Sequence, residues 1–219
     1  MKNMEEPVLN VKSSNLKLSK INNRYGKHNS RRVCQGDILK DVKFLEFVSF
    51  TSKKGRLFTY PYLIVISQDC DLESDFGRKE VKLEITEEET QDHKLHTILV
   101  CPAYDINNFK KGDHLKSQHI KMRNFPEKEI IKVKNNKEYE RFHYLHEEVD
   151  LQIPELVIDF KHFYTIPRDI IYEQYEKSYL ATMNILFREN LSQRFSNFLS
   201  RIGLPEVTTL SNFSSIPSN

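Results

Sequence analysis

The segment 60–72 constrains the fold most, because an apolar run ends there in a polar cluster. Residues 63–66 are apolar at every position, which predicts a strand with both faces buried. The polar side chains that follow are Ser67, Gln68, Asp69, Cys70 and Asp71. A buried strand is a rigid support for reactive side chains at its end. We therefore expect a candidate site directly after this strand.

Length and charge set broad limits on the class of protein. The 219 residues suffice for one substantial domain, alone or with an appendage. The formal net charge is only +2, from 33 basic and 31 acidic residues. The chain as a whole therefore carries no field that predicts nucleic-acid binding, and a local basic surface stays open.

Cysteine usage and hydropathy predict a cytoplasmic protein. Cys34, Cys70 and Cys101 are widely spaced, without a CxxC pair or a Cys/His finger pattern, so no structural zinc site is predicted. The N-terminus has no apolar signal-peptide region, and an odd cysteine count fits a reducing compartment. No apolar run approaches roughly 18 residues, so we expect no membrane-spanning helix and no membrane partner.

The composition along the chain predicts four parts. Residues 1–32 are polar with a basic end, which indicates a flexible N-terminal arm, or an arm that contacts nucleic acid or another partner. Residues 33–169 are expected to form the main domain, with a polar, Lys-rich insertion at about 105–140 that holds a helix or two. Residues 170–205 are expected to be a helical appendage and residues 206–219 a frayed tail.

Within the main domain, the apolar pattern predicts strands separated by polar loops. The expected strands span residues 36–50, 57–66, 95–101, 141–146 and 156–160. The segments 51–56 and 71–79 are expected to be loops. This order lacks the regular alternation of a βαβ protein. It predicts an α+β fold with a mainly β core, arranged as a small bent antiparallel sheet or barrel.

The C-terminal part carries an apolar stripe at helical spacing. Its members are Tyr172, Tyr175, Tyr179, Met183 and Leu186, followed by Leu191, Phe195, Phe198 and Ile202. The spacing predicts helices that separate near Glu189-Asn190 and end at Gly203 and Pro205. Such a stripe is typical of core packing or of a dimer interface.

Four segments of the main domain form a recognisable series, which is Gly36-Asp37-Ile38-Leu39, a basic loop with Gly55 and Arg56, Pro61 before residues 63–67, and Thr97-Ile98-Leu99-Val100-Cys101-Pro102. This series resembles the MazF/PemK-like toxin family. The resemblance covers roughly residues 33–104, and more faintly 156–169, and implies an SH3-like barrel with helical additions, usually dimeric. It also implies metal-independent cleavage of single-stranded RNA in a bacterial toxin–antitoxin or phage-defence setting.

Two positions depart from the pattern of that family. Ala103 follows the second proline, where the family has Thr or Ser, and Tyr60 stands before Pro61, where the family has Arg. Both changes favour a binding module without catalytic activity on the same barrel, as the alternative to an endoribonuclease.

The polar cluster and the resemblance together select candidate catalytic residues, which are Arg56, Ser67, Asp69 and Cys70. Arg56 would stabilise charge on the scissile phosphate, or else mark a solvated hairpin tip. Cys70 would be a nucleophile if a base such as His143 or His146 activated it, and otherwise a packed or hydrogen-bonded thiol. The candidate binding residues are Lys53, Lys54, Gln68 and His143.

A metal site is a weaker hypothesis for the same cluster. Asp69 and Asp71 would share a face if the strand continued, and could then hold Mg²⁺ or Ca²⁺. The alternative is that both carboxylates cap the turn after the strand. His143 and His146 are three residues apart, so on a strand we expect them on opposite sides, at the surface and not at a shared metal.

Three functions follow from these patterns. The first is a metal-independent endoribonuclease, which needs no cofactor. The second is a binding module for single-stranded RNA or for a partner such as an antitoxin protein. A homodimer formed through the barrel or the C-terminal helices would fit both. The third is a metal-dependent hydrolase built on Asp69, Asp71 and a histidine.

Overall fold

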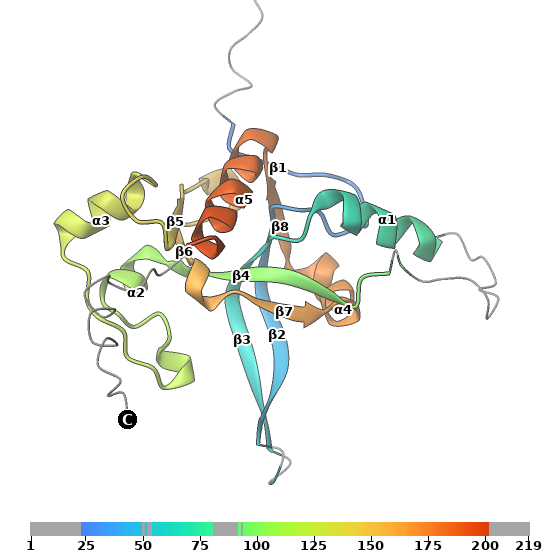
Figure 1. The fold of residues 1–219 in the computed structure, drawn as a ribbon, viewed down its shortest axis with the longest axis horizontal. Helices are drawn as coiled ribbons and strands as arrows, with labels where there is room; N and C mark the ends of the chain where they lie inside the picture. Colours follow the sequence, from blue (N-terminus) through green and yellow to red (C-terminus); the bar gives the residue numbers. More distant parts are fainter. Residues whose placement is uncertain (1–22, 50, 52–53, 81–91, 93, 202–219) are drawn as a thin grey trace, which may run out of the picture.

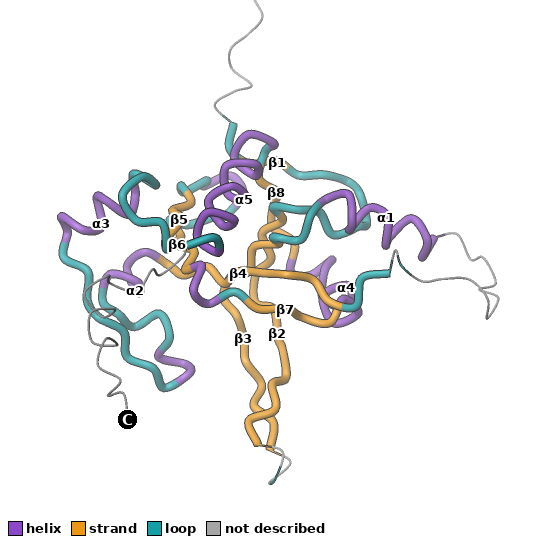
Figure 2. The backbone as a smooth tube through the Cα atoms, viewed as in Figure 1, coloured by secondary structure: helices purple, strands orange, loops and turns teal. Residues whose placement is uncertain are grey.

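The computed structural model describes residues 23–49, 51, 54–80, 92 and 94–201. In this part of the chain, eight strands form one antiparallel sheet flanked by five α-helices (Figures 1 and 2). The strands are β1 (Tyr25–Gly26), β2 (Asp37–Ser49), β3 (Lys54–Val65), β4 (Thr97–Asp105), β5 (Phe142–Leu145), β6 (Leu156–Asp159), β7 (Tyr164–Pro167) and β8 (Tyr179–Met183). The α-helices are α1 (Asp69–Glu80), α2 (Ile106–Lys110), α3 (Glu127–Lys134), α4 (Arg168–Ser178) and α5 (Ile185–Leu199). Short 3-10 helices are η2 (Lys116–Gln118), η3 (Val149–Leu151) and η4 (Phe160–His162).

The sheet curls into a half-barrel with the strand order β1-β8-β2-β3-β4-β6-β5 (Figure 1). One edge of β4 pairs with β7 through residues 97–100 and with β6 through residues 103–105, and η4 separates these two strands along the chain. The expected α+β fold with a bent antiparallel sheet is therefore confirmed. Its identity as an SH3-like barrel stays a prediction.

Helices cover both faces of this sheet. On one face, Ile64 and Ile66 pack in a core cluster with Leu191, Phe195 and Phe198 of α5. On the other face, a second cluster joins Leu63 and Val65 to residues of α1 and α4, which are Leu72, Ile171 and Tyr175. The prediction of a strand buried on both sides at 63–66 is confirmed, because its successive side chains enter the two clusters in turn.

The β2–β3 hairpin extends away from the rest of the domain (Figure 1). It leaves the sheet where Asp41 adopts a left-handed conformation (φ 54°) beside Pro61, which has no N–H to donate. Beyond this point Leu45 pairs with Leu57, and both side chains are exposed. The loop expected at 51–56 is shorter than predicted, because β3 already begins at Lys54 and includes Arg56.

The described part of the N-terminal arm is built into the sheet, contrary to the flexible arm expected for residues 1–32. β1 pairs with β8, with Tyr25 opposite Met183. The Tyr25 side chain is buried in the core cluster under α5. One aromatic side chain in a polar segment gives little signal in the sequence, which explains the error. Residues 1–22 lie outside the described part.

The C-terminal region contains a strand where helix was expected. Residues Tyr179–Met183 form β8, which lies between β1 and β2 in the sheet and makes this region part of the domain instead of an appendage. Ala181 and Met183 point into the core at a period of two, which the helical pattern obscured. α5 then runs without a break past Glu189-Asn190, contrary to the expected separation.

The segments 105–140 and 71–79 both contain helices. The insertion expected at about 105–140 does contain helices, α2 and α3, which pack with β5 in a third core cluster. The loop expected at 71–79 is instead α1, which buries Leu72 and Asp75 on one side. Residues 202–219, with the predicted stop and tail, lie outside the described part. Among the described residues, no helix has the length and apolar character to cross a bilayer.

Candidate functional site

Asp69, from the polar cluster after β3, holds three segments together. Its carboxylate accepts two hydrogen bonds from the Arg32 guanidinium, at 3.0 and 3.1 Å, and one from the Gln35 backbone N–H at 3.1 Å. Arg188 of α5 lies 3.6 Å from its second oxygen. Burial acts to raise the pKa of Asp69, but the hydrogen bonds from Arg32 and Gln35 outweigh it and hold the pKa below its ordinary value. Asp69 therefore links the β1–β2 loop, α1 and α5.

Of the other residues of this cluster, Gln68, Cys70 and Asp71 contact one another, whereas Ser67 bonds elsewhere. The Ser67 hydroxyl accepts a hydrogen bond from the Leu99 backbone N–H at 2.8 Å. The Cys70 thiol is exposed and lies 3.7 Å from Oε1 of Gln68 and 3.5 Å from Oδ1 of Asp71, to which it donates. The expected turn-capping role of the two aspartates is not seen for Asp69, because its carboxylate faces Arg32 and Gln35.

Arg56 is distant from these residues. It lies in β3 opposite Glu46, exposed, with its guanidinium 5.7 Å from the Phe58 ring centre. A strand rises about 3.3 Å per residue, so the length of β3 places Arg56 on the order of 30 Å from Ser67. The structure thus does not bring the predicted catalytic residues together. Of the predicted binding residues, Lys54 opens β3 and Lys53 lies outside the described residues.

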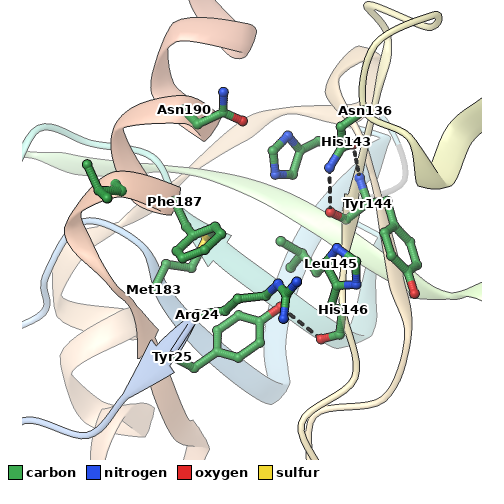
Figure 3. Close-up of a pocket in the computed structure, with 11 residues that line it drawn as sticks. Arg24, Tyr25, Asn136, His143, Tyr144, Leu145, His146, Met183, Phe187 and Asn190 are labelled. Carbon is green, nitrogen blue, oxygen red and sulfur yellow. Dashed lines mark hydrogen bonds between the residues drawn. The ribbon is translucent and has the colours of Figure 1, made fainter. Parts of the chain in front are cut away.

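A pocket of about 360 Å³ lies between α5, β5 and the β1–β8 edge of the sheet (Figure 3). Its lining residues are Arg24, Tyr25, Asn136, His143, Tyr144, Leu145, His146, Met183, Leu186, Phe187 and Asn190. The size is within the range of small-molecule sites, which starts at about 300 Å³. Of the residues selected from sequence, only His143 lies here.

His143 is buried in the wall of this pocket, contrary to the expected surface position. Its side chain is only 4% exposed, and its Nδ1 atom has no hydrogen-bond partner. Burial, and then the positive charges of Arg194 and His146, lower the pKa of His143 to about 3. The imidazole is therefore neutral at physiological pH, and its Nδ1 atom is an unsatisfied polar atom in the pocket wall.

His146 lines the same pocket, although the strand pattern placed it on the opposite side from His143. The alternation fails because β5 ends at Leu145, one residue before His146. Burial lowers the pKa of His146, and the nearby Arg24 lowers it further. The Tyr25 hydroxyl donates a hydrogen bond to the His146 carbonyl at 2.8 Å and fixes the chain at this point.

Arg24 and Phe187 form the other side of the pocket. The Arg24 guanidinium lies 5.8 Å from the centre of the Phe187 ring, and its Nε atom is buried without a hydrogen-bond partner. The wall formed by β5 is held by Asn136, whose amide donates to the Tyr144 carbonyl at 2.9 Å and accepts from the Tyr144 N–H at 2.6 Å. Figure 3 shows the Asn190 side chain on the α5 side, near His143. The pocket thus joins an aromatic face, a guanidinium, two imidazoles and an amide.

A second buried polar cluster lies around Asp159 in β6. Arg141 donates two hydrogen bonds to this carboxylate, at 2.8 and 2.6 Å, and His162 Nδ1 lies 3.4 Å from it. Close by, His114 packs between Tyr104 and Phe109, and burial lowers its pKa to about 4. Because Arg141 and His162 already pair with the Asp159 carboxylate, we regard this cluster as structural.

Metal-binding geometry does not occur at Asp69 and Asp71. Among the described residues, one group places three suitable ligand atoms within 4.8 Å of one another, and it consists of His28, Cys34 and Asp37. These residues lie in or beside the β1–β2 loop. Sequence reasoning missed them because their spacing matches no zinc-finger pattern.

No protein-family model, curated protein or solved structure matches this chain. The resemblance to MazF/PemK-like toxins therefore stays a prediction from the residues in the sequence.

Proposed function

We propose that the protein binds single-stranded RNA and seats one nucleotide in the pocket between α5 and β5. The observation that carries the proposal is the pairing of an aromatic ring with unsatisfied nitrogen atoms in one cavity. Phe187 supplies the ring, while Arg24 Nε and His143 Nδ1 are buried without partners.

The chemistry of the pocket suits an unstacked base and its phosphate. Proteins bind single-stranded RNA by stacking bases on aromatic rings or guanidinium planes and by hydrogen-bonding to base edges. Phe187 and Arg24 are positioned for stacking, and the Asn190 amide and the two histidines can bond to a base edge.

The charge around the pocket favours an anionic ligand. After burial, the positive charge of Arg194 lowers the pKa of His143. The charges of Arg24 and Lys134 likewise lower the pKa of His146, while Glu155 raises it. The positive charges of Arg24 and Arg194 would be offset by a bound phosphate. The near-zero net charge of the whole chain is compatible with this local field.

The resemblance of residues 33–104 to MazF/PemK-like toxins supports RNA as the ligand. It also supports a role in a toxin–antitoxin or phage-defence system, with an antitoxin protein as a second partner.

Replacing Phe187 with alanine is expected to weaken RNA binding by about 5- to 150-fold, because stacking of one base contributes roughly 1–3 kcal/mol. Fluorescence anisotropy with short labelled single-stranded RNAs of mixed sequence would measure this. Ile185→Ala is the matched control, since Ile185 is exposed on the same helix and does not line the pocket. Equal loss in both variants, or no binding by the wild type, would contradict the proposal.

An endoribonuclease is the second candidate function, favoured by the two neutral imidazoles beside Arg24. His146 would take the proton of the ribose 2′-hydroxyl, whose oxygen bonds to the phosphorus, and Arg24 would stabilise the phosphate in the transition state. The P–O5′ bond breaks, the leaving 5′-oxygen takes a proton from water, and a 2′,3′-cyclic phosphate remains. In this model the arginine that stabilises the phosphate is Arg24, and not Arg56 as expected from the sequence.

A cleavage assay with EDTA present distinguishes the two arginines. If the pocket is catalytic, His146→Ala and Arg24→Ala are expected to lower the cleavage rate by about 10²-fold or more, while Arg56→Ala leaves it unchanged. Loss of cleavage in Arg56→Ala alone would instead support the hairpin site expected from the sequence. Absence of cleavage in the wild type would leave the binding function only.

A further inference from the structure

We propose that the β1–β2 loop binds a zinc ion through His28, Cys34 and Asp37, independently of the RNA-binding proposal. The ligand atoms of these three residues lie within 4.8 Å of one another. Asp37 is fully buried, Cys34 is buried, and His28 is partly open to solvent. All three come from one ten-residue stretch, so closing the site needs no movement of distant elements.

The donor set favours zinc over other common metals. An imidazole nitrogen, a thiolate and a carboxylate oxygen are the usual ligands of zinc, whereas Mg²⁺ and Ca²⁺ prefer oxygen alone. In a tetrahedral zinc site such ligand atoms are roughly 3.3–3.8 Å apart. His28 Nε2 already lies 3.1 Å from Asp37 Oδ1, so a small outward shift of the imidazole opens the metal position.

The carboxylate of Asp37 is already oriented by other groups. Its Oδ2 accepts hydrogen bonds from the Cys34 N–H and the Tyr175 hydroxyl, both at 2.7 Å, and its Oδ1 accepts one from the Thr182 hydroxyl at 2.5 Å. Hydrogen bonds of this kind fix the carboxylate ligands of metal sites. The zinc ion would replace the contacts of His28 Nε2 with Asp37 and with the Tyr175 hydroxyl, which lies 3.3 Å away, and the three hydrogen bonds to the Asp37 carboxylate would remain.

The thiol of Cys34 has only weak partners. Its sulfur lies 3.8 Å from the Ser30 hydroxyl and 3.8 Å from the Arg32 carbonyl. On binding zinc, the thiol loses its proton to solvent and the sulfur forms the metal bond as a thiolate. The exposed side of His28 leaves the fourth position to a water molecule.

Hydrogen bonds from backbone and side chains hold this loop in place. The Gly36 N–H donates to the Val65 carbonyl at 2.9 Å, the His28 N–H donates to the Tyr179 hydroxyl at 3.1 Å, and the Gln35 N–H donates to Asp69 at 3.1 Å. The same loop connects β1, and with it the Arg24–Tyr25 side of the pocket, to β2. A zinc ion would therefore fix the entry of β1 into the sheet.

Metal analysis of the untagged, full-length protein tests this inference. After incubation with Zn²⁺ and gel filtration, the wild type and Cys70→Ser are expected to retain about one zinc per chain, and Cys34→Ser at least tenfold less. Cys70 is the matched control, because its thiol is exposed and belongs to another element. Retention of less than a tenth of an equivalent by the wild type, or equal retention by all three proteins, would overturn the inference.

Replacement of zinc by Co²⁺ gives a second measurement that does not depend on the stability of the variants. A thiolate bound to Co²⁺ produces a charge-transfer absorption in the near ultraviolet. We expect it in the wild type and in Cys70→Ser, and expect its loss in Cys34→Ser. A wild-type spectrum with no thiolate band would show that Cys34 is not a ligand. Far-ultraviolet circular dichroism of each variant would show that the fold is retained.

Discussion

Replacing Asp75 with alanine is expected to lower the free energy of unfolding by about 3–5 kcal/mol, whereas Asp169→Ala should cost about 1 kcal/mol or less. Both carboxylates pair with the same guanidinium, that of Arg168. The two substitutions therefore remove carboxylates that differ in burial but share the same partner, Arg168.

The two carboxylates differ strongly in environment. The Asp75 side chain is 2% exposed and that of Arg168 is 9% exposed, while Asp169 is 78% exposed. Arg168 donates to Asp75 at 2.8 Å and to Asp169 at 2.9 Å. Asp75 also accepts a hydrogen bond from the Leu95 N–H at 3.0 Å, so its removal leaves this N–H without a partner and leaves the buried Arg168 with only the exposed carboxylate of Asp169. Water compensates the loss of Asp169 but not that of Asp75.

Urea denaturation at neutral pH, followed by circular dichroism, would measure both values. A second consequence is that Asp75→Ala loosens α1 from α4, because the Asp75–Arg168 ion pair joins these helices. Equal destabilisation by the two substitutions would show that burial of the pair does not matter and would contradict the prediction.

The parts of the fold that the sequence predicts are those with a strong local signal. Residues 63–66 are apolar at every position, and a strand buried on both faces is the simplest fold for such a run. The stripe of Leu191, Phe195 and Phe198 repeats at helical spacing and does pack into the core. In both cases the local pattern and the burial agree.

Elements stabilised by distant partners were missed. In the part of α1 whose side chains are described, Leu72, Asp75 and Phe76 lie on the packed side, and the contact between Asp75 and Arg168 spans 93 residues. The sequence of β8 predicts a helix, because Tyr179 and Met183 fit a spacing of four as well as of two. Only pairing with β1 and β2, which no local pattern records, decides between them.

The pocket could not be predicted for the same reason. Its residues come from β1, β5, β8, α5 and the loop after α3, and only the curl of the sheet brings them together. The polar cluster after β3 gave a strong signal, but its most constrained member, Asp69, is occupied by Arg32 and Gln35. A polar cluster at the end of a strand can therefore indicate a place where several elements are joined, and not only a site of chemistry.

Acid is expected to destabilise the protein through its buried histidines, above the range in which carboxylates titrate. His143 has a pKa of about 3 in the folded protein and an ordinary value near 6.5 in the unfolded chain. Between these values the unfolded chain binds the proton and the folded protein does not. The stability is therefore fully present above pH 6.5 and falls as the pH decreases, by up to about 1.4 kcal/mol per pH unit for this one group.

The remaining histidines with shifted values act mostly in the same direction. Burial is the largest cause of the lowered pKa values of His114, His146 and His162. His28 opposes them, because its hydrogen bond with Asp37 raises its pKa. The stability that His28 contributes is present below pH 6.5 and is lost as the pH rises through its raised value. Besides His143, three histidines have lowered pKa values and one, His28, has a raised value. Together they give a net loss of stability in acid.

Urea denaturation of the wild type and of His143→Leu at pH 7.0, 5.5 and 4.5 would test this prediction. The wild type is expected to lose at least about 3 kcal/mol between pH 7.0 and 4.5, with about 2.5 kcal/mol each from His143 and His114 and an opposing contribution from His28. His143→Leu removes a group that must stay neutral, so the pH-dependent loss should be smaller by about 2.5 kcal/mol over this range. Replacement of the exposed His96 with leucine is the control and should keep the wild-type pH dependence. The same loss in His143→Leu as in the wild type would show that His143 can be protonated within the folded protein, which would require water or an anion to reach it through the pocket.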